Sequence, residues 1–279
     1  MHITKASGES VAFDSGKLYR SLHRAGASQA HAEAIVRQVR EQLYEGMTTK
    51  QIYRLAHRLL RRDASHTAAR YSLKQALLGF GPSGFPFEQF IAKLLESDGF
   101  EVETGLVRQG HCVPHELDVF GQAGQRLVVG ECKFHNRQHM VSDVKVSLYI
   151  HARFQDLLGG FLNEGPWKNH SKEGWIFTNT RFTDEALAYG RCSGLHLVSW
   201  NTPTGASLRE WIDRSGLHPL TCLTTMTQQE KNRMLERNVV LAGDLVARPD
   251  LLERLAGMAP SRINAVVREA EQLCATRPE

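Results

Sequence analysis

Two carboxylates and a lysine lie close together in the segment His115–His135, which reads HELDVFGQAGQRLVVGECKFH. The alternation of polar and apolar residues on both sides of GQAGQ predicts two strands joined by a turn. Side chains two positions apart in a strand share a face, so Glu131 and Lys133 point one way and Cys132 points the other way. The first carboxylate, Asp118, lies on the preceding strand of this predicted hairpin.

These residue types suit the hydrolysis of a phosphodiester bond. Carboxylate oxygens are the ligands that Mg²⁺ and Mn²⁺ prefer, and a bound divalent ion is a Lewis acid at the phosphoryl oxygen. A cationic amine beside the attacking water stabilises the negative charge that develops. The alternative is a cross-strand salt bridge on the surface of a sheet, and the spacing alone fits both equally.

The composition limits the class of protein. The chain has 279 residues, with 34 Lys and Arg against 30 Asp and Glu, and a net charge of +4 permits an anionic partner without demonstrating one. The apolar runs are far shorter than the roughly 20 residues of a membrane span, and the start MHITKASGES lacks the apolar core of a signal peptide. The five Cys form no CxxC pair, which favours a reducing compartment and argues against a zinc site. We expect a soluble, cytoplasmic protein that does not enter a membrane.

The chain divides by pattern into three parts. Residues 1–82 open with two short strands and continue with four helices, each with apolar positions three to four apart. The run GFGPSGFP then interrupts any helix. Helices and strands are mixed over residues 83–215, which predicts an α/β domain with helices on both faces of a mixed sheet. Residues 216–279 are again helical.

The middle part resembles a known nuclease family. FEQFIAKLLESDGFEVETG, followed by HELDVF and VVGECKFHN, is similar to the Mrr-type restriction endonucleases of the PD-(D/E)XK superfamily, over about residues 84–211. The resemblance implies an endonuclease that depends on Mg²⁺ or Mn²⁺, cuts double-stranded DNA and belongs to a restriction system. RNA stays open as a substrate. The proline of the signature departs from the pattern, since Pro114 lies four residues before the acidic residue that it should directly precede.

The resemblance also implies roles for particular residues. It implies that Asp118 and Glu131 are metal ligands and that Lys133 positions or activates water. Glu88, on the preceding helix, becomes a further acidic member of the catalytic set. Cys132, in the middle of the ECK triplet, is included among the candidate metal ligands.

Several neighbours have two possible roles. Three residues near the predicted site have two open roles, namely His115, His135 and Asn136. One role is contact with a phosphate or with the metal shell, and the other is a solvated position at a strand end. We expect four aromatic residues to lie in the core, namely Tyr149, Phe154, Trp175 and Phe177.

The start of the chain resembles a second family. ITKASGESVAFDSGKLYRSLHRAG and the helices that follow it, up to about residue 80, are similar to the ATP-cone, a small nucleotide-binding domain. The resemblance implies ATP or dATP as an effector. A basic strand that faces a helix N-terminus makes a triphosphate pocket, with Lys5 and Lys17 as its charges. Gly8 in the strand turn and Asp14 before the helix complete the predicted nucleotide-binding set.

One difference from the cone pattern bears on affinity. Many ATP-cones have Lys-Arg in the first strand, whereas Ala6 follows the lysine here and one phosphate ligand is lost. The alternative to nucleotide binding is a degenerate cone that serves as a dimerisation module or as a lid over the DNA site. Arg70, Tyr71 and Lys74 either close the pocket or are ordinary charged and polar residues of a helix face.

Together these predictions describe a nucleotide-regulated endonuclease made of an ATP-cone, an α/β nuclease core and a helical tail, working as a homo-oligomer. The C-terminal helices are expected to cap the core or to pair with another subunit, and a faint likeness of GMAPSRINAVVREAEQL to helix-hairpin-helix modules is the alternative. A rival function is a non-cleaving, nucleotide-sensing DNA-binding protein on the same fold. The repressor that joins a cone to a zinc ribbon is excluded, because paired cysteines are absent from the sequence.

Overall fold

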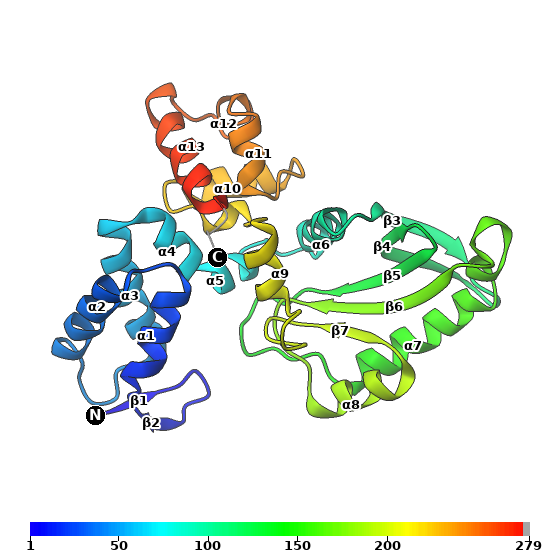
Figure 1. The fold of residues 1–279 in the computed structure, drawn as a ribbon, viewed down its shortest axis with the longest axis horizontal. Helices are drawn as coiled ribbons and strands as arrows, with labels where there is room; N and C mark the ends of the chain where they lie inside the picture. The colour runs from blue at the N-terminus through cyan, green and yellow to red at the C-terminus, as the bar shows by residue number, and fades with distance from the viewer. Residues whose placement is uncertain (276–279) are drawn as a thin grey trace. The chain divides into compact units, whose positions relative to one another are not determined.

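The computed structural model describes residues 1–275, and these form two compact units (Figure 1). Residues 1–76 together with residues 218–275 make the first unit. Residues 77–217 make the second unit.

The first unit begins with a small hairpin. β1 (His2–Thr4) and β2 (Ser10–Ala12) pair in antiparallel fashion. Gly8 lies in the turn with φ +85°, where its N–H donates to the carbonyl of Lys5. Residues with a side chain rarely adopt this left-handed conformation, so the turn favours glycine at this position.

The helices of the amino-terminal part start at capping side chains, as the sequence predicts. Asp14, Ser28 and Thr48 each accept a backbone N–H in the first turn of the helix that follows. The expected fourth helix is in fact two helices that break at Ser72. The five helices are α1 (Ser15–Arg24), α2 (Gln29–Glu41), α3 (Thr49–Asp63), α4 (Ser65–Tyr71) and α5 (Leu73–Leu78). Their core includes the fully buried side chains of Leu22, Ile35 and Leu60.

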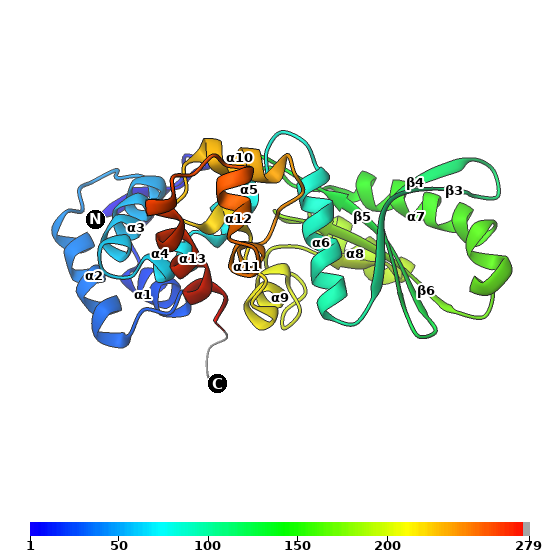
Figure 2. The ribbon, with the colours of Figure 1, turned by 90° about the horizontal axis from the view of Figure 1, so that it is seen from above.

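The C-terminal helices pack onto the amino-terminal part, which corrects the expectation that they cap the α/β domain. They are α10 (Gln228–Leu235), α11 (Ala242–Ala247), α12 (Asp250–Arg254) and α13 (Pro260–Cys274), preceded by the 3₁₀ turn η3 (Leu220–Cys222). α13 lies beside α4 in both views (Figure 1, Figure 2). The guanidinium of Arg70 donates to the carbonyl of Leu273 at 2.8 Å, and the hydroxyl of Thr221 donates to the carbonyl of Ala76 at 2.9 Å.

A five-stranded mixed sheet forms the centre of the second unit, which confirms the predicted α/β architecture. The strand order is β3-β4-β5-β6-β7. β4 pairs in antiparallel fashion with β3 on one side and with β5 on the other, whereas β6 pairs parallel with β5 and β7 pairs parallel with β6. The strands are β3 (Glu101–Gln109), β4 (Pro114–Ala123), β5 (Arg126–Lys133), β6 (Ser171–Thr178) and β7 (His196–Val198).

Helices cover both faces of this sheet. α6 (Phe85–Ser97) lies on one face, and α7 (Val144–Leu158) and α8 (Asp184–Ser193) lie on the other face (Figure 1). α9 (Leu208–Ser215), which follows β7, packs next to α6. Two short 3₁₀ turns, η1 (Phe161–Asn163) and η2 (Gly165–Trp167), join α7 to β6.

The core of the second unit requires close packing between strands and helices. α6 buries its apolar side chains Phe87, Phe90, Ile91, Leu94 and Leu95 against the sheet. Gly130 on β5 leaves room for the ring of Phe177, since a Cβ at this position would lie 2.9 Å from that ring. Such a contact is shorter than side-chain packing allows, so β5 needs glycine here.

The helices are all short. The longest, α3, α7 and α13, have 15 residues each, whereas a membrane-spanning helix needs about 20 apolar residues. Throughout residues 1–275, no helix combines the length and the apolar character needed to cross a bilayer.

Candidate functional site

The site in the second unit lies where two paired strands separate. The pairing between β4 and β5 ends at Val119 and Gly130. Beyond this point β4 continues against β3, and β5 continues to Lys133 against β6. Asp118 and Glu131 are the next residues of the two strands, so the predicted carboxylates lie in the gap that opens between them.

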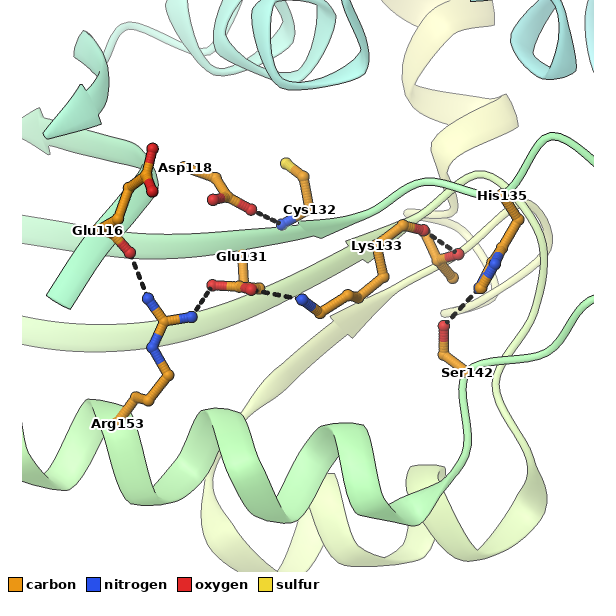
Figure 3. A network of polar contacts seen from close by, with 9 residues as sticks. Glu116, Asp118, Glu131, Cys132, Lys133, His135, Ser142 and Arg153 are labelled. Carbon is orange, nitrogen blue, oxygen red and sulfur yellow. Dashed lines mark hydrogen bonds and ion pairs between the residues drawn. The ribbon is translucent and has the colours of Figure 1, made fainter. Parts of the chain in front are cut away.

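Asp118 is held by a backbone group of the neighbouring strand. Its Oδ2 accepts a hydrogen bond from the N–H of Cys132 at 2.7 Å (Figure 3). Burial, followed by the charge of Glu131, raises the pKa of Asp118 to about 6, while the hydrogen bond from Cys132 and the charges of Lys133 and Arg153 oppose this rise. A raised pKa of this kind is typical of a carboxyl that is withdrawn from water and lies near a second carboxylate.

Glu131 is held from both sides by cations. Its Oε1 lies 2.5 Å from Nζ of Lys133, and its Oε2 lies 2.6 Å from Nη1 of Arg153 (Figure 3). Its side chain is only 11% exposed, and that of Arg153 is 15% exposed. Glu131 is thus part of salt bridges, but they are not the cross-strand bridge considered from the sequence. Lys133 belongs to the same strand as Glu131, and Arg153 comes from α7.

Arg153 is the member of the site that the sequence prediction missed. Its Nη2 also donates to the backbone carbonyl of Glu116 on β4. A signal was available in the periodicity of α7. Arg153 falls on the apolar stripe that Val146, Ile150 and Leu157 define, and a charged residue at a core position requires a partner.

Glu88 joins the site from the first turn of α6. Burial raises the pKa of its carboxyl to about 7, and the charges of Asp118, Glu116 and Glu131 add to this rise, while Lys133 opposes it. The structure thus brings Glu88 into electrostatic contact with the hairpin carboxylates, as the family resemblance implies.

The side chain of Cys132 does not suit the metal role assigned to it. Burial raises the pKa of its thiol well above the usual value, and the neighbouring carboxylates Asp118 and Glu88 add to the effect. A protonated thiol is a poor partner for a hard cation. What Cys132 contributes to the site is its backbone N–H.

The remaining donors are oxygens. Among residues 1–275, no group of three or more His, Cys, Asp or Glu side chains is arranged to hold a metal ion, so the predicted set of Asp118, Glu131 and Cys132 is not formed. The two carboxylates by themselves fit a hard divalent cation, because both are of the preferred ligand type. The charge of Glu131 also adds to the effect of burial on the pKa of Asp118, and a cation would relieve this repulsion.

The two histidines near the hairpin have structural partners. His115 lies 2.7 Å from Oδ2 of Asp156 on α7, away from the carboxylate pair. The backbone N–H of His135 donates to Oδ1 of Asn179 at 2.9 Å. The Nε2 of His135 lies 3.1 Å from the hydroxyl of Ser142 (Figure 3). Burial, helped by the charge of Lys133, lowers the pKa of His135.

Two other predictions for neighbours have different outcomes. Asn136 is exposed, which agrees with a solvated position. Phe177 is fully buried and Phe154 and Trp175 are partly buried, but Tyr149 is 60% exposed on α7, so its assignment to the core is wrong. Its ring lies 5.5 Å from the guanidinium of Arg153.

The first unit has a cavity of about 270 Å³ where the nucleotide was predicted to bind. Lys5, Asp14 and Lys17 are among the residues that line it. Tyr53 and Tyr71 line it as well, and their rings stack with centroids 5.2 Å apart. The volume lies near the lower end of the range of ligand pockets. The predicted basic residues and one predicted aromatic residue therefore meet at one cavity.

Other members of the predicted nucleotide set have different roles. Asp14 caps α1 by accepting the N–H of Lys17 at 3.0 Å, and this bond holds the pKa of the Asp14 carboxyl below its usual value. Gly8 shapes the strand turn. Arg70 does not close the cavity, because its guanidinium binds carbonyl groups at the end of α13, and Lys74 is not among the lining residues.

Comparisons with known proteins agree with this division of the chain. Residues 1–77 match a family model described as ATP cone domain, and residues 218–274 match one described as AF1548-like, C-terminal. An uncharacterized protein of Archaeoglobus fulgidus is 32% identical over 184 residues, which are 66% of this chain and 99% of that protein. The chain belongs to the AF1548-like family. A crystal structure of AF1548, described as a protein of unknown function, superposes with a TM-score of 0.56 at 30% identity and covers 69% of this chain and 98% of its own.

Membership has different consequences for the two units. The ATP cone implies nucleotide binding, and the cavity of the first unit lies within the matched residues. The descriptions of these two AF1548-like proteins name no activity. The function of the α/β unit must therefore be argued from its own site.

Proposed function

We propose that this protein is a cytoplasmic, Mg²⁺-dependent DNA endonuclease of the PD-(D/E)XK superfamily, similar to the Mrr-type restriction enzymes. The observation that carries the proposal is the meeting of Asp118, Glu131 and Lys133 in the gap between β4 and β5. Glu88 on α6 supplements this set. The order of helices and strands in the second unit is also the order that the family resemblance implies.

The carboxylates of Asp118 and Glu131 would hold the divalent ion. When bound, the ion supplies a Lewis acid at the phosphoryl oxygen. Lys133 keeps a positive charge beside these carboxylates, where it orients the attacking water and stabilises the developing negative charge. The short pairing of Lys133 with Glu131 fixes the direction of the ammonium group.

Glu88 is suited to proton transfer. Its pKa of about 7 leaves it partly protonated at neutral pH, so it can accept or release a proton under the conditions of the reaction. Asp118, with a pKa of about 6, is mostly ionised at the same pH and remains able to bind a cation. Both carboxyl groups thus have raised pKa values, and that of Glu88 lies near neutral pH, as an acid–base role requires.

ATP or dATP acts as an effector in this proposal. Lys5 and Lys17 provide charge for phosphate groups at the cavity of the cone. The carboxylate at this cavity, Asp14, is engaged in capping α1, which favours a pocket that holds phosphates over one that cleaves them. Residues 1–275 of each chain contain one such carboxylate site, and cutting both strands of a duplex takes two, so we propose a homo-oligomer as the working form.

A second candidate is a nucleotide-sensing DNA-binding protein that does not cut. One observation favours it. Both carboxylate oxygens of Glu131 already have cationic partners, Lys133 and Arg153, and such a network is satisfied without a metal ion. In this case the residues of the site stabilise the fold, and the nuclease resemblance reports ancestry alone.

Incubation with supercoiled plasmid separates the two candidates. The purified full chain is mixed with modified and unmodified plasmid, with and without Mg²⁺ and ATP, and with an RNA of similar length. The endonuclease proposal expects nicked or linear DNA in Mg²⁺ and intact DNA in EDTA, with the Glu131→Gln protein inactive. DNA binding without any cleavage, with every plasmid and nucleotide tried, would support the non-cleaving protein.

A further inference from the structure

An arginine occupies a core position of α7 next to the carboxylate site. Arg153 follows the apolar stripe of Val146 and Ile150, and its side chain is 15% exposed. A buried guanidinium costs free energy unless charged or polar partners satisfy it. Its placement therefore has to be explained by what it contacts.

The contacts of Arg153 join three elements. From α7, Nη1 reaches Oε2 of Glu131 on β5 at 2.6 Å, and Nη2 donates to the backbone carbonyl of Glu116 on β4 (Figure 3). The guanidinium also lies 5.5 Å from the ring centre of Tyr149, one helical turn earlier. The planar guanidinium presents its N–H donors in a rigid fork at a fixed separation, whereas an ammonium group is a single point charge with rotatable donors.

These contacts bridge the gap where the strands have stopped pairing. The pairing of β4 with β5 ends at Val119 and Gly130, directly before the carboxylates Asp118 and Glu131. Beyond it, one bridge is the hydrogen bond from the N–H of Cys132 to Asp118, and the other runs through Arg153. The guanidinium thus links the carboxylate on one strand to the backbone of the other.

We infer that Arg153 is a positioning residue, which holds the carboxylate of Glu131 in the orientation that cation binding and catalysis require. The inference rests on the proposed endonuclease function. Lys133 holds one oxygen of Glu131 and Arg153 holds the other. With Arg153 removed, Glu131 keeps one partner and its carboxylate is free to turn about that single contact.

Charge balance is the competing explanation for Arg153, and cation affinity distinguishes the two. If the arginine only balanced charge, the Arg153→Gln protein would be more negative at the site and would bind Mn²⁺ more tightly. If the arginine positions Glu131, the same change weakens Mn²⁺ binding by about 10-fold, as expected when a partner that orients a metal ligand is lost. Calorimetric titration with Mn²⁺ in the absence of DNA gives this affinity directly.

Kinetics on plasmid DNA provide the second measurement. We expect Arg153→Gln to lower kcat by about 100-fold with an unchanged KM for DNA, because a small misplacement of a reacting group has an effect of this size. Arg153→Lys should be intermediate, since it keeps the charge but lacks the rigid fork that holds both acceptors at a fixed separation. Arg191→Gln on α8, at an exposed position away from the network, is the matched control with the wild-type kcat. Full kcat in Arg153→Gln, or tighter Mn²⁺ binding, overturns the inference.

A stability cycle keeps this test separate from the test of the proposed function. Wild-type protein that neither cuts DNA nor binds Mn²⁺ refutes the endonuclease proposal. The melting temperatures of Arg153→Gln, of Glu131→Gln and of the double variant still measure whether the two side chains are coupled. If the two side chains are coupled, the double variant loses less stability than the sum of the two single losses, so we expect it to melt above the temperature given by adding the two single shifts. Additive shifts would show that Arg153 does not hold Glu131, and would refute the inference whatever the enzyme does.

Discussion

Asp118 accepts the backbone N–H of Cys132 across two strands that are no longer paired, with 2.7 Å between Oδ2 and the nitrogen. A side chain thus bridges the strands immediately beyond the end of their pairing. The bond uses one oxygen of the carboxylate and fixes its direction. It also lowers the pKa of Asp118 against the larger effect of burial.

The Asp118→Asn change tests the catalytic role with little disturbance of the fold. The amide oxygen of Asn can still accept the N–H of Cys132, but the negative charge that a cation needs is gone. We expect plasmid cleavage in Mg²⁺ to fall by orders of magnitude. DNA affinity should be kept or improved, because a negative charge that faces a phosphate backbone is removed.

The control for this variant is Asp184→Asn, at an exposed position in the first turn of α8. It makes the same chemical change outside the site and should leave cleavage unaltered. If Asp118 serves only to bridge the two strands through the N–H of Cys132, Asp118→Asn instead leaves cleavage as it was. Cleavage, gel-shift affinity and thermal unfolding on the two variants decide between these outcomes.

The raised pKa values at the site predict a pH dependence of stability for the metal-free protein. The pKa of Glu88 is about 7 and that of Asp118 is about 6, both above their usual values chiefly because of burial. The folded protein therefore keeps protons that the unfolded chain loses near pH 4. Their stabilising contribution is complete below pH 4 and is lost as the pH rises through 6 and 7.

We expect the free energy of unfolding in EDTA to fall by about 3–4 kcal/mol between pH 4 and pH 8 from this pair, after the contribution of half-buried Glu88 is reduced for solvent screening. Urea unfolding at a series of pH values measures it. Glu88→Gln should flatten the profile, whereas Glu96→Gln, an exposed position on the same helix, should not. An unchanged profile in Glu88→Gln would show that this carboxyl titrates normally in the folded protein.

The element order and the carboxylate hairpin were predictable because they depend on local patterns. Alternation places Glu131 and Lys133 on one face, and the turn residues set the hairpin. The break at Ser72 and the short helix α9 were not predicted, since an interruption or a length of eight residues leaves little periodic signal. Arg153 was missed because an arginine between apolar positions was not treated as a buried charge with a partner on another strand.

The location of the C-terminal helices could not be obtained from the sequence for a different reason. α13 shows an amphipathic pattern, which indicates that one face is covered but not what covers it. Its partner, α4, lies about two hundred residues earlier in the chain, and the contact is made through single side chains such as Arg70. Pairings at this separation are set by the whole fold.

Arg70 gives a direct test of that packing. Its guanidinium donates to the carbonyls of Leu273 and Ala275 at 2.8 and 2.6 Å, which satisfies carbonyl groups that a helix end leaves without partners. We expect Arg70→Ala to destabilise the protein by about 2 kcal/mol, the loss typical of hydrogen bonds from a charged group. Arg58→Ala, an exposed position on α3, should change the midpoint of thermal unfolding little. Equal midpoints for the two variants would show that this contact contributes nothing to holding α13.

The last prediction concerns the nucleotide. Lys5 and Lys17 line the cavity of the cone, and both are available to phosphate groups at low cost. Lys5 pairs with Glu9 at 2.9 Å, but both side chains are largely exposed, and such pairs contribute about 0–1 kcal/mol. A triphosphate with several negative charges should therefore displace Glu9 from the lysine. We expect ATP and dATP to bind the 279-residue chain at one site per chain.

Calorimetry on the 279-residue chain measures this binding. The full chain is needed because residues 218–275 pack in the same unit as the cone, and a fragment would expose the covered face of α4. The double change Lys5→Ala and Lys17→Ala should abolish the heat of binding, since it removes the positive charge that recognises the phosphates. Arg58→Ala, which also removes one positive charge from the same unit but lies outside the lining of the cavity, should bind as the wild type does. Heat equal to that of dilution at millimolar ATP and dATP would show that this cone no longer binds nucleotide, in keeping with Ala6 in place of a second basic residue.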